Sequence, residues 1–537
     1  MNRAPPPPDQ YMPGEARLYI PRLPNAITVA VLAIVAIGIF ARIMNYPLQH
    51  DEEIHVAAGR MLFQEPLYTS LNYNHMPNLP LLLAGLYTLT GTDHLLLAGR
   101  ILIVAGWIMT AGMFVLIARH FRQPFHLAGL AILLLTGNTL LGPAGMIVTN
   151  NFLPVPFALL GFYLFAVATD GPAPKPIFAL LAGISLAFAI GLKVSYIFLA
   201  PPFAIAALLV PHGLSVWRRV RLVALPLLGG ALIGGLPAIL FLLDNPDSFL
   251  AHTLRYFTIA HKAYWQAIAE PKVMAIAGKV MLAQDAWLAG SIVLCACLAG
   301  FFALMIVARD GARQLLWWPA ALMVALMGLG AATAFVPTPS FPQYYVPPIP
   351  FLIVLMMILH ARLAPSDRAP AALLLVAVAL LTLAAAAPRL MLDLPRLASP
   401  GKWTGMTIHR EGERVRQALA GAGLNGRVAT LSPIIPLEGG LPIYPEFASG
   451  PFVYRVADLI PRSDRRWYRM VSAGDLPAFL AVARPDGILV GAEGTLDTGF
   501  RDYAAAHRYR RVDMADPALA LFIRQQPAAA AALPTGP

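Results

Sequence analysis

Long apolar segments separated by short polar ones dominate the first 388 residues. Eleven of these segments are apolar and extended enough to cross about 30 Å of bilayer hydrocarbon as helices. They are residues 25–45, 95–118, 125–142, 152–169, 177–195, 197–210, 222–243, 286–308, 315–336, 344–361 and 370–388. An odd number of spans places the segments before the first and after the last on opposite sides of a membrane. A shorter apolar stretch, 78–91, predicts a helix that lies in the membrane interface.

The pattern changes after residue 388. Strand-like runs at 427–435, 487–491 and 518–523 alternate with helical patterns at 411–420, 476–483 and 502–507. The predicted fold class is therefore an all-α polytopic membrane domain followed by a small α/β domain outside the cytoplasm. The expected boundaries are a cytoplasmic lead-in at 1–24, the membrane domain at 25–388 with outer loops 46–93 and 244–285, the α/β domain at 389–525 and a disordered tail at 526–537.

Composition and charge support this division and orient it. Hydrophobic residues make up 58% of the chain and charged residues 12%, half of the roughly 25% typical of soluble proteins. This excludes a soluble enzyme, a disulfide scaffold and a disordered chain. Charged residues are about 9% of the chain up to 388 and about 21% after it. Thirteen basic residues fall in the loops of one side and five in those of the other, which predicts a cytoplasmic N-terminal side and a periplasmic C-terminal domain in a bacterial inner membrane. The net charge of +11 is thereby explained without nucleic acid.

The first outer loop opens with a cluster of titratable residues, His50-Asp51-Glu52-Glu53-Ile54-His55. If a helix begins at Asp51, then Asp51 and His55 share one face of it. Acids at a helix start are also stabilised by the helix dipole, so a solvated loop with a capped helix is one interpretation. The other is a general base or metal ligands beside an apolar bilayer.

Cations further along the chain allow similar alternatives. The segment 252–265 mixes aromatic and basic residues, which suits an interfacial belt or the capture of a lipid phosphate by Arg255, His261 or Lys262. Lys193 stands alone in an apolar run, as a snorkelling residue does. Arg100 lies inside a predicted span, as Arg42 does, and both are expected to pair with loop acids.

An ordered set of motifs surrounds the acidic cluster: it is followed by residues 57–60, 65–68 and 75–82, and then by Ala98-Gly99-Arg100 at the start of the second span. This order resembles the first outer loop of GT-C type membrane glycosyltransferases, especially glycosyltransferase family 39, which includes protein O-mannosyltransferases and bacterial aminoarabinose transferases. The resemblance covers residues 25–210 well and 340–360 more weakly.

The resemblance implies a glycosyltransferase with an outward-facing site that uses a polyprenyl-phosphate sugar and inverts the anomeric carbon. Asp51 then corresponds to the catalytic base, with Glu52 as its neighbour. Lys193 matches the lysine at the outer end of the fifth span and implies contact with the donor phosphate. The segment 343–347 matches a late motif, which adds Tyr345 to the phosphate-binding candidates.

The sequence departs from the family pattern at three points. Asn150 and Asn151 stand where members often carry an Asp, His75 replaces a lysine, and Gln343 replaces a basic residue. A divalent cation, Mg or Mn, held by Asp51, Glu52 and His75 remains an expectation, but a two-carboxylate site loses one candidate ligand. The residues assigned to the acceptor or to support of the site are Glu53, His55, His75, Asn150, Asn151 and Arg100.

Two other functions are compatible with a polytopic chain of this kind: a flippase or transporter of lipid-linked glycans, and a non-catalytic subunit of envelope assembly. Transporters concentrate ionisable residues at the bilayer midplane and often contain inverted repeats. Here the ionisable residues cluster in the outer loops and no repeat is visible. The expected partners are therefore membrane lipid, a polyprenyl-phosphate sugar, and an envelope lipid or glycan as acceptor.

Overall fold

The computed structural model describes residues 22–171, 173–268, 271–461 and 463–525, so the predicted lead-in (nearly all of it) and tail lie outside the described residues. All eleven predicted apolar segments are mostly helical. Within the described residues, five helices are long and apolar enough to cross a membrane: α1 (Asn25–Asn45 of Arg22–Asn45), α4 (Leu95–His120), α17 (Gly290–Asp310), η5 with α19 (Pro342–Ala361) and α20 (Pro365–Met391). A pair bent by 58°, Val216–Gly234 and Leu236–Asp244, makes a sixth if counted as one span.

The other five predicted spans are shorter apolar helices. They are α5 (Phe125–Thr136), α7 (Pro154–Thr169), α8 (Pro176–Leu192), η1 with α9 (Val194–Leu209) and α18 (Trp318–Ala334). The prediction of eleven spans is thus supported by length for five or six helices and stays a prediction for the rest.

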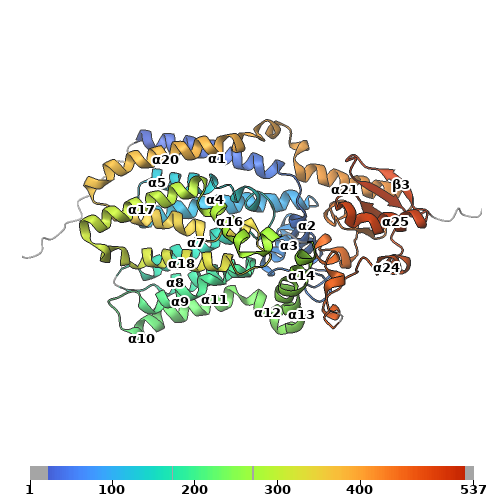
Figure 1. Cartoon of the computed structure of the whole chain (residues 1–537), viewed down its shortest axis with the longest axis horizontal. Coiled ribbons are helices and arrows are strands. Elements are labelled where there is room, and N and C mark those ends of the chain that lie inside the picture. The colour runs from blue at the N-terminus through green and yellow to red at the C-terminus, as the bar shows by residue number, and fades with distance from the viewer. Residues whose placement is uncertain (1–21, 172, 269–270, 462, 526–537) are drawn as a thin grey trace, which may run out of the picture.

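The helices run side by side along the long axis of the molecule (Figure 1). Their closest contact joins α8 to α11 (Leu225–Gly234) and depends on glycine. A Cβ on Gly230 would lie 1.9 Å from the carbonyl oxygen of Leu180, and one on Gly183 would lie 2.0 Å from that of Leu227. The two backbones therefore touch only because both positions lack a side chain.

The outer loops fold into short helices at one end of this bundle, between the long helices and the C-terminal sheet (Figure 1). Loop 46–93 forms α2 (His50–Met61) and α3 (Asn78–Thr90). Loop 244–285 forms α13 (Pro246–Leu250), η3 (Ala251–His261), α14 (Lys262–Ala267), α15 (Pro271–Met274) and α16 (Ile276–Trp287). The short α10 (Val216–Arg219) lies at the opposite end of the molecule.

The C-terminal part contains a four-stranded sheet in the order β1-β2-β4-β3. Its strands are β1 (Val428–Thr430), β2 (Gly487–Val490), β3 (Arg510–Asp513) and β4 (Ala520–Ile523), and its principal helices are α21 (Thr404–Gly421), α24 (Leu476–Ala483) and α25 (Thr498–Ala506). β1 and β2 are parallel, and the other pairs are antiparallel.

Two details of this sheet differ from the sequence prediction. The strand expected at 427–435 ends at Thr430, and α22 (Ile434–Glu438) follows it. Pro433 and Pro436 lack the N–H that a strand ladder needs, which explains the early end. β3 was not predicted because its sequence, Arg-Arg-Val-Asp, shows no apolar run and lies mostly exposed at the sheet edge.

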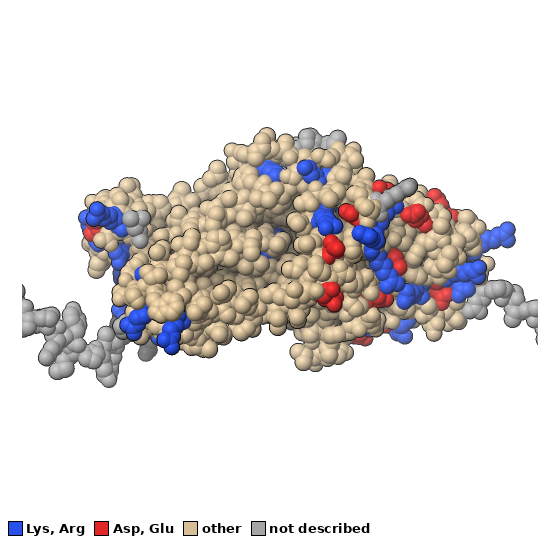
Figure 2. All heavy atoms as spheres, turned by 90° about the horizontal axis from the view of Figure 1, so that it is seen from below, with Lys and Arg blue, Asp and Glu red and all other residues tan. Residues whose placement is uncertain are grey.

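The C-terminal part is docked onto the outer loops by polar contacts. The Arg469 guanidinium lies 3.2 Å from Glu65 of the first loop and 2.9 Å from Glu446. Arg42 on α1 forms an ion pair with Asp393 at 2.5 Å, in agreement with the acid partner that the sequence predicts for this arginine. Charged side chains gather at the two ends of the face in Figure 2, and the stretch between them is largely uncharged.

Candidate active site

A cavity of about 320 Å³ lies where the outer loops meet the C-terminal part. Its lining combines side chains from both outer loops, from the start of two membrane helices and from α23 (Pro451–Tyr454) and the residue after it. The lining residues are His50, Asp51, Ile54, His55, Asn74, His75, Thr149, Asn150, Asn151, Lys193, Tyr256, Phe257, His261, Trp265, Phe341, Gln343, Tyr344, Phe452 and Arg455.

Asp51 is positioned by the first turn of α2. Gln49 caps this helix and forms a capping box with Glu52, while acids in the first turn are favoured by the helix dipole. Asp51 and His55 both line the cavity, as the helical spacing predicted. The Asp51 side chain is 37% exposed, but it faces the cavity, and the surrounding protein removes it from bulk water. This desolvation raises the pKa of the Asp51 carboxyl, and nearby His50, Arg455 and Lys193 partly offset the rise.

Two cations share the cavity with this carboxylate. The Lys193 ammonium donates a hydrogen bond to Asn151 Oδ1 at 2.5 Å and lies 5.1 Å from the centre of the Tyr344 ring. The Arg455 guanidinium lies 5.0 Å from the ring centres of both Tyr264 and Phe452. Its buried Nε has no hydrogen-bond partner among the described residues, so this donor is available to a ligand.

Three histidines of the cavity, His55, His75 and His261, are neutral near pH 7. Burial is the main reason that the pKa of His55 falls well below its usual value and that those of His75 and His261 fall to about 3. His261 Nε2 accepts a hydrogen bond from the Trp265 indole at 2.9 Å, which leaves the ring proton of the neutral form on Nδ1. His261 can therefore orient a phosphate by hydrogen bonding, but Lys193 and Arg455 supply the positive charge.

Glu52 and Arg100 lie outside the cavity and bind each other. The Arg100 Nη2–Glu52 Oε2 distance is 2.8 Å, and Nε donates to Oε1 at 3.2 Å; both side chains are fully buried. Glu52 Oε1 also accepts from the Val148 amide at 2.9 Å. With both oxygens engaged, Glu52 does not fit the role of metal ligand or second base beside Asp51 and His75. The residues present at the cavity therefore do not form a two-carboxylate metal site.

Several other predicted site residues also lie away from the cavity. Arg255 pairs with Asp247 at 3.5 Å, and Lys262 is exposed outside the cavity. The Tyr345 hydroxyl is buried and donates to the carbonyl of Lys279 at 3.0 Å, so Tyr344 takes its place in the cavity wall. Glu53 is buried on another face of α2, where its Oε2 has no hydrogen-bond partner among the described residues.

Three carboxyl groups meet where α2 contacts the loop after β2, because Glu53 interacts with Glu493 and Asp497. Burial, with help from Asp497, raises the pKa of Glu493 from 4.5 to about 7.

The raised pKa of Glu493 in the folded protein means that stability is lost as the pH rises from about 4.5 to about 7. We expect Glu493→Gln to flatten this decline in melting temperature measured across that range. The Asp502→Asn variant, which changes an exposed acid, should follow the wild-type curve. A Glu493→Gln curve parallel to the wild-type curve would show that ionisation of Glu493 does not cause the decline in stability.

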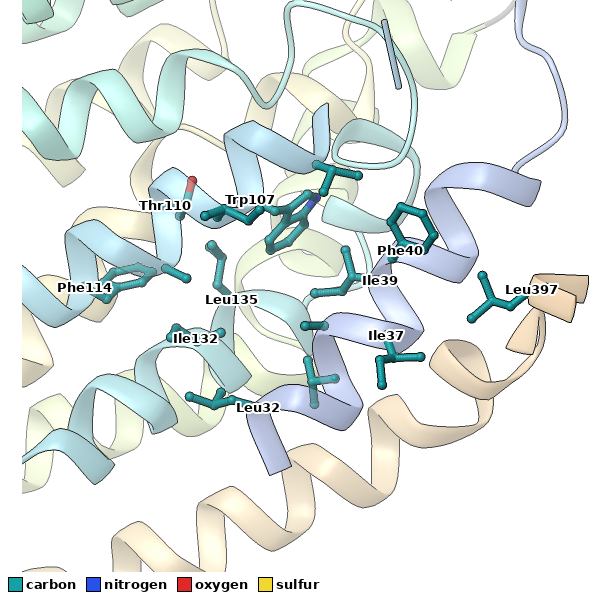
Figure 3. Close-up of a pocket in the computed structure, with 15 residues that line it drawn as sticks. Leu32, Ile37, Ile39, Phe40, Trp107, Thr110, Phe114, Ile132, Leu135 and Leu397 are labelled. Carbon is teal, nitrogen blue, oxygen red and sulfur yellow. The ribbon is translucent and has the colours of Figure 1, made fainter. Parts of the chain in front are cut away.

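A second cavity, of about 530 Å³, lies among α1, α4 and α5 beside Leu397 (Figure 3). Its lining is almost entirely apolar, and the Thr110 hydroxyl is already bonded to the Gly106 carbonyl. Ile37 and Ile108 of its wall are 51% and 69% exposed, so the cavity opens on the apolar outer surface. It offers packing for hydrocarbon and no group for chemistry.

Sequence reasoning missed Arg455, Phe452 and Asn74 as parts of the site. Arg455 and Phe452 come from the C-terminal part, far along the chain from the acidic cluster, and no motif there marks them. The one available signal was an arginine next to aromatic residues in 452–455, a combination that suits cation–π contact.

No protein-family model and no curated protein matches this chain. Among solved structures, ArnT from Cupriavidus metallidurans bound to undecaprenyl phosphate matches with a TM-score of 0.59 and 15% identity, covering 93% of this chain and 98% of that chain. The apo form of the same protein matches with a TM-score of 0.58 and 14% identity. The apo oligosaccharyltransferase of Archaeoglobus fulgidus gives 0.48 and 11%, covering 89% of this chain and 71% of that chain. The chain therefore has a fold like that of ArnT, which is the fold that its resemblance to GT-C type membrane glycosyltransferases implies.

Proposed function

We propose that this chain is a membrane glycosyltransferase that moves a sugar from a polyprenyl-phosphate donor to a hydroxyl group of an envelope lipid or glycan. The observation that carries the proposal is the pairing of charges in the 320 Å³ cavity. Asp51 is the one carboxylate among its described lining residues, and Lys193 and Arg455 are its cations. A base and an anion-binding pair in one enclosed space are what transfer from a phosphate-linked sugar requires.

The proposed reaction is a single displacement. Asp51 takes the proton of the acceptor hydroxyl as its oxygen bonds to the anomeric carbon, and the bond from that carbon to the phosphate oxygen breaks. The electron pair leaves on the polyprenyl phosphate, whose added charge Lys193 and Arg455 neutralise. One displacement inverts the anomeric carbon. The raised pKa of Asp51 makes it a stronger base than an ordinary aspartate.

The rest of the cavity wall suits a sugar ring. Six aromatic side chains line it together with three asparagines and the neutral histidines. Aromatic faces cover the apolar faces of a ring, while a small number of polar groups fix its orientation. The donor class is further supported by the structural neighbour, since ArnT was solved with undecaprenyl phosphate bound.

The charge distribution supports an outward-facing site. α10, which carries Arg218 and Arg219, lies at the end of the molecule opposite the sheet (Figure 1). The loop that follows α17 and the loop that precedes α20 also meet, because Arg309 at the end of α17 is 3.3 Å from Asp367 at the start of α20. Basic loops favour the cytoplasmic side, which supports a periplasmic position for the cavity and the C-terminal part.

The function can be tested with purified protein in detergent and undecaprenyl-phosphate sugars labelled in the sugar. We expect release of undecaprenyl phosphate, by transfer to an added envelope lipid fraction or slowly to water. Envelope lipids and glycans of a strain lacking the protein should lose the mass of one sugar. Movement of the intact labelled lipid across a vesicle membrane without bond cleavage would instead establish a flippase.

Removing either cavity cation should weaken donor binding. A hydrogen bond to a charged group contributes about 1.5–3 kcal/mol, so Lys193→Met and Arg455→Met should each weaken undecaprenyl phosphate binding about 10- to 100-fold. Native mass spectrometry or microscale thermophoresis measures this affinity. Lys262→Met is the matched control, because this exposed lysine lies outside the cavity. Unchanged affinity in both cavity variants would remove these residues from the phosphate site.

A further inference from the structure

A cluster of metal-ligating side chains lies apart from the cavity, where the turn between α3 and α4 meets α21. Within the part of the chain that the structure describes, Asp93, His94 and His409 form the one group of three His, Cys, Asp or Glu residues whose ligand atoms all lie within 4.8 Å of one another. The ring centroids of His94 and His409 are 3.8 Å apart. None of the three lines the 320 Å³ cavity.

A buried carboxylate orients one of these histidines. His409 Nδ1 donates to Glu438 Oε2 at 2.9 Å, and Glu438 Oε1 accepts from the Leu96 amide at 2.7 Å. This contact fixes the proton on Nδ1 and leaves the lone pair on Nε2. The arrangement of carboxylate, histidine and metal is the usual way in which proteins prepare an imidazole ligand.

The second histidine, His94, has a ring nitrogen that makes no hydrogen bond to the described residues. His94 Nδ1 is buried and has no hydrogen-bond partner among the described residues. The other ring nitrogen, Nε2, lies 3.9 Å from Asp93 Oδ1. A buried polar atom left without a partner is unfavourable, and a cation bound by this imidazole would use one of its two nitrogens as a ligand. Glu438 and Asp93 add the negative charge that favours a cation at this place.

We propose that Asp93, His94 and His409 bind one Zn²⁺-class ion that clamps the turn between α3 and α4 to α21. Two imidazoles and a carboxylate are ligands that zinc accepts, with water in the fourth position. Ligand atoms around tetrahedral zinc lie about 3.4 Å apart, so the ligand atoms must move closer together while the partly exposed His94 ring turns away from the His409 ring. Asp93, whose side chain is 77% exposed, is free to make that movement.

The position of the site indicates its role. α21 and α22 both pack against α4, and Glu438, which holds His409, also binds the backbone at the start of α4. An ion at this point would therefore hold the C-terminal part against the membrane helices. This role is structural and does not depend on the glycosyltransferase proposal.

The test uses the full chain stripped with EDTA and titrated with Zn²⁺ by calorimetry, with melting temperature as a second readout. We expect a site that raises the melting temperature and whose affinity falls at least 100-fold in His409→Gln and in His94→Ala. The exposed His212→Ala variant should bind as the wild type does. His75→Ala separates this site from the cavity histidines, and it too should retain the tight site.

His94→Ala keeps the test decisive if His409→Gln does not fold, because His94 lies in a partly exposed turn. Two results would overturn the proposal. One is the absence of wild-type Zn²⁺ binding at micromolar concentration. The other is binding that survives unchanged in His94→Ala but is lost in His75→Ala, which would place the ion in the cavity.

Discussion

Asp51→Asn is expected to lower the rate of sugar transfer by at least 100-fold while leaving undecaprenyl phosphate binding as tight as in the wild type. General base catalysis contributes about 10²- to 10⁴-fold, and asparagine has nearly the shape of aspartate but cannot take the acceptor proton. Because Asp51 interacts with Lys193 and Arg455, its neutralisation also leaves both cations free for the phosphate. Initial rates with labelled donor and a separate binding measurement distinguish the two effects.

The pH dependence of the same variant provides a second check. The raised pKa of Asp51 means that wild-type activity should increase as the pH rises through a value above that of an ordinary aspartate, since only the ionised carboxylate accepts a proton. The residual activity of Asp51→Asn should lack this step. Asp247→Asn removes an exposed acid of the second outer loop and should retain the wild-type rate and profile. A fully active Asp51→Asn enzyme would show that another group is the base.

The sequence predicted the helices well because long apolar runs leave few alternatives to a helix in a bilayer. It also predicted that Asp51 and His55 share a face, which follows from helical periodicity alone. It could not tell which acid of the 51–53 cluster faces the cavity. Consecutive helical residues point about 100° apart, and the direction that each takes depends on partners elsewhere. Arg100 determines that Glu52 points away from the cavity, and the loop after β2 covers Glu53.

The same limit applies to the phosphate-binding candidates. Tyr344 and Tyr345 occupy one short 3₁₀ turn, Pro342–Tyr345, so one faces the cavity and the other faces the core. His261 is buried at the end of η3 while the adjacent Lys262 is exposed. Both segments reach the cavity wall, but the choice within each pair depends on tertiary packing that a single sequence does not contain.

Arg100→Met is expected to be among the most destabilising substitutions in the chain, at about 3–5 kcal/mol, the range for breaking one side of a buried ion pair. Arg100 donates to both Glu52 oxygens and, through Nη1, to the carbonyls of Ile43 at 2.9 Å and Tyr46 at 2.7 Å. The substitution leaves a buried carboxylate with backbone partners only and two carbonyls at the end of α1 without this donor. Unfolding in mixed detergent micelles with rising dodecyl sulfate measures the loss.

A double-mutant cycle separates the pair from its surroundings. Glu52→Gln with Arg100→Met removes both charges, so the double variant should be more stable than the sum of the single losses predicts. Arg416→Met breaks an exposed pair with Glu413 on α21 and should leave stability unchanged within error. Arg100→Lys should recover only part of the loss, because an ammonium cannot make the two parallel bonds of the guanidinium. The Glu52–Arg100 pair ties α2, which carries Asp51, to α1 and α4. Additive losses in the cycle would mean that the packing of α2, and not the Glu52–Arg100 bond, holds Asp51 in the cavity.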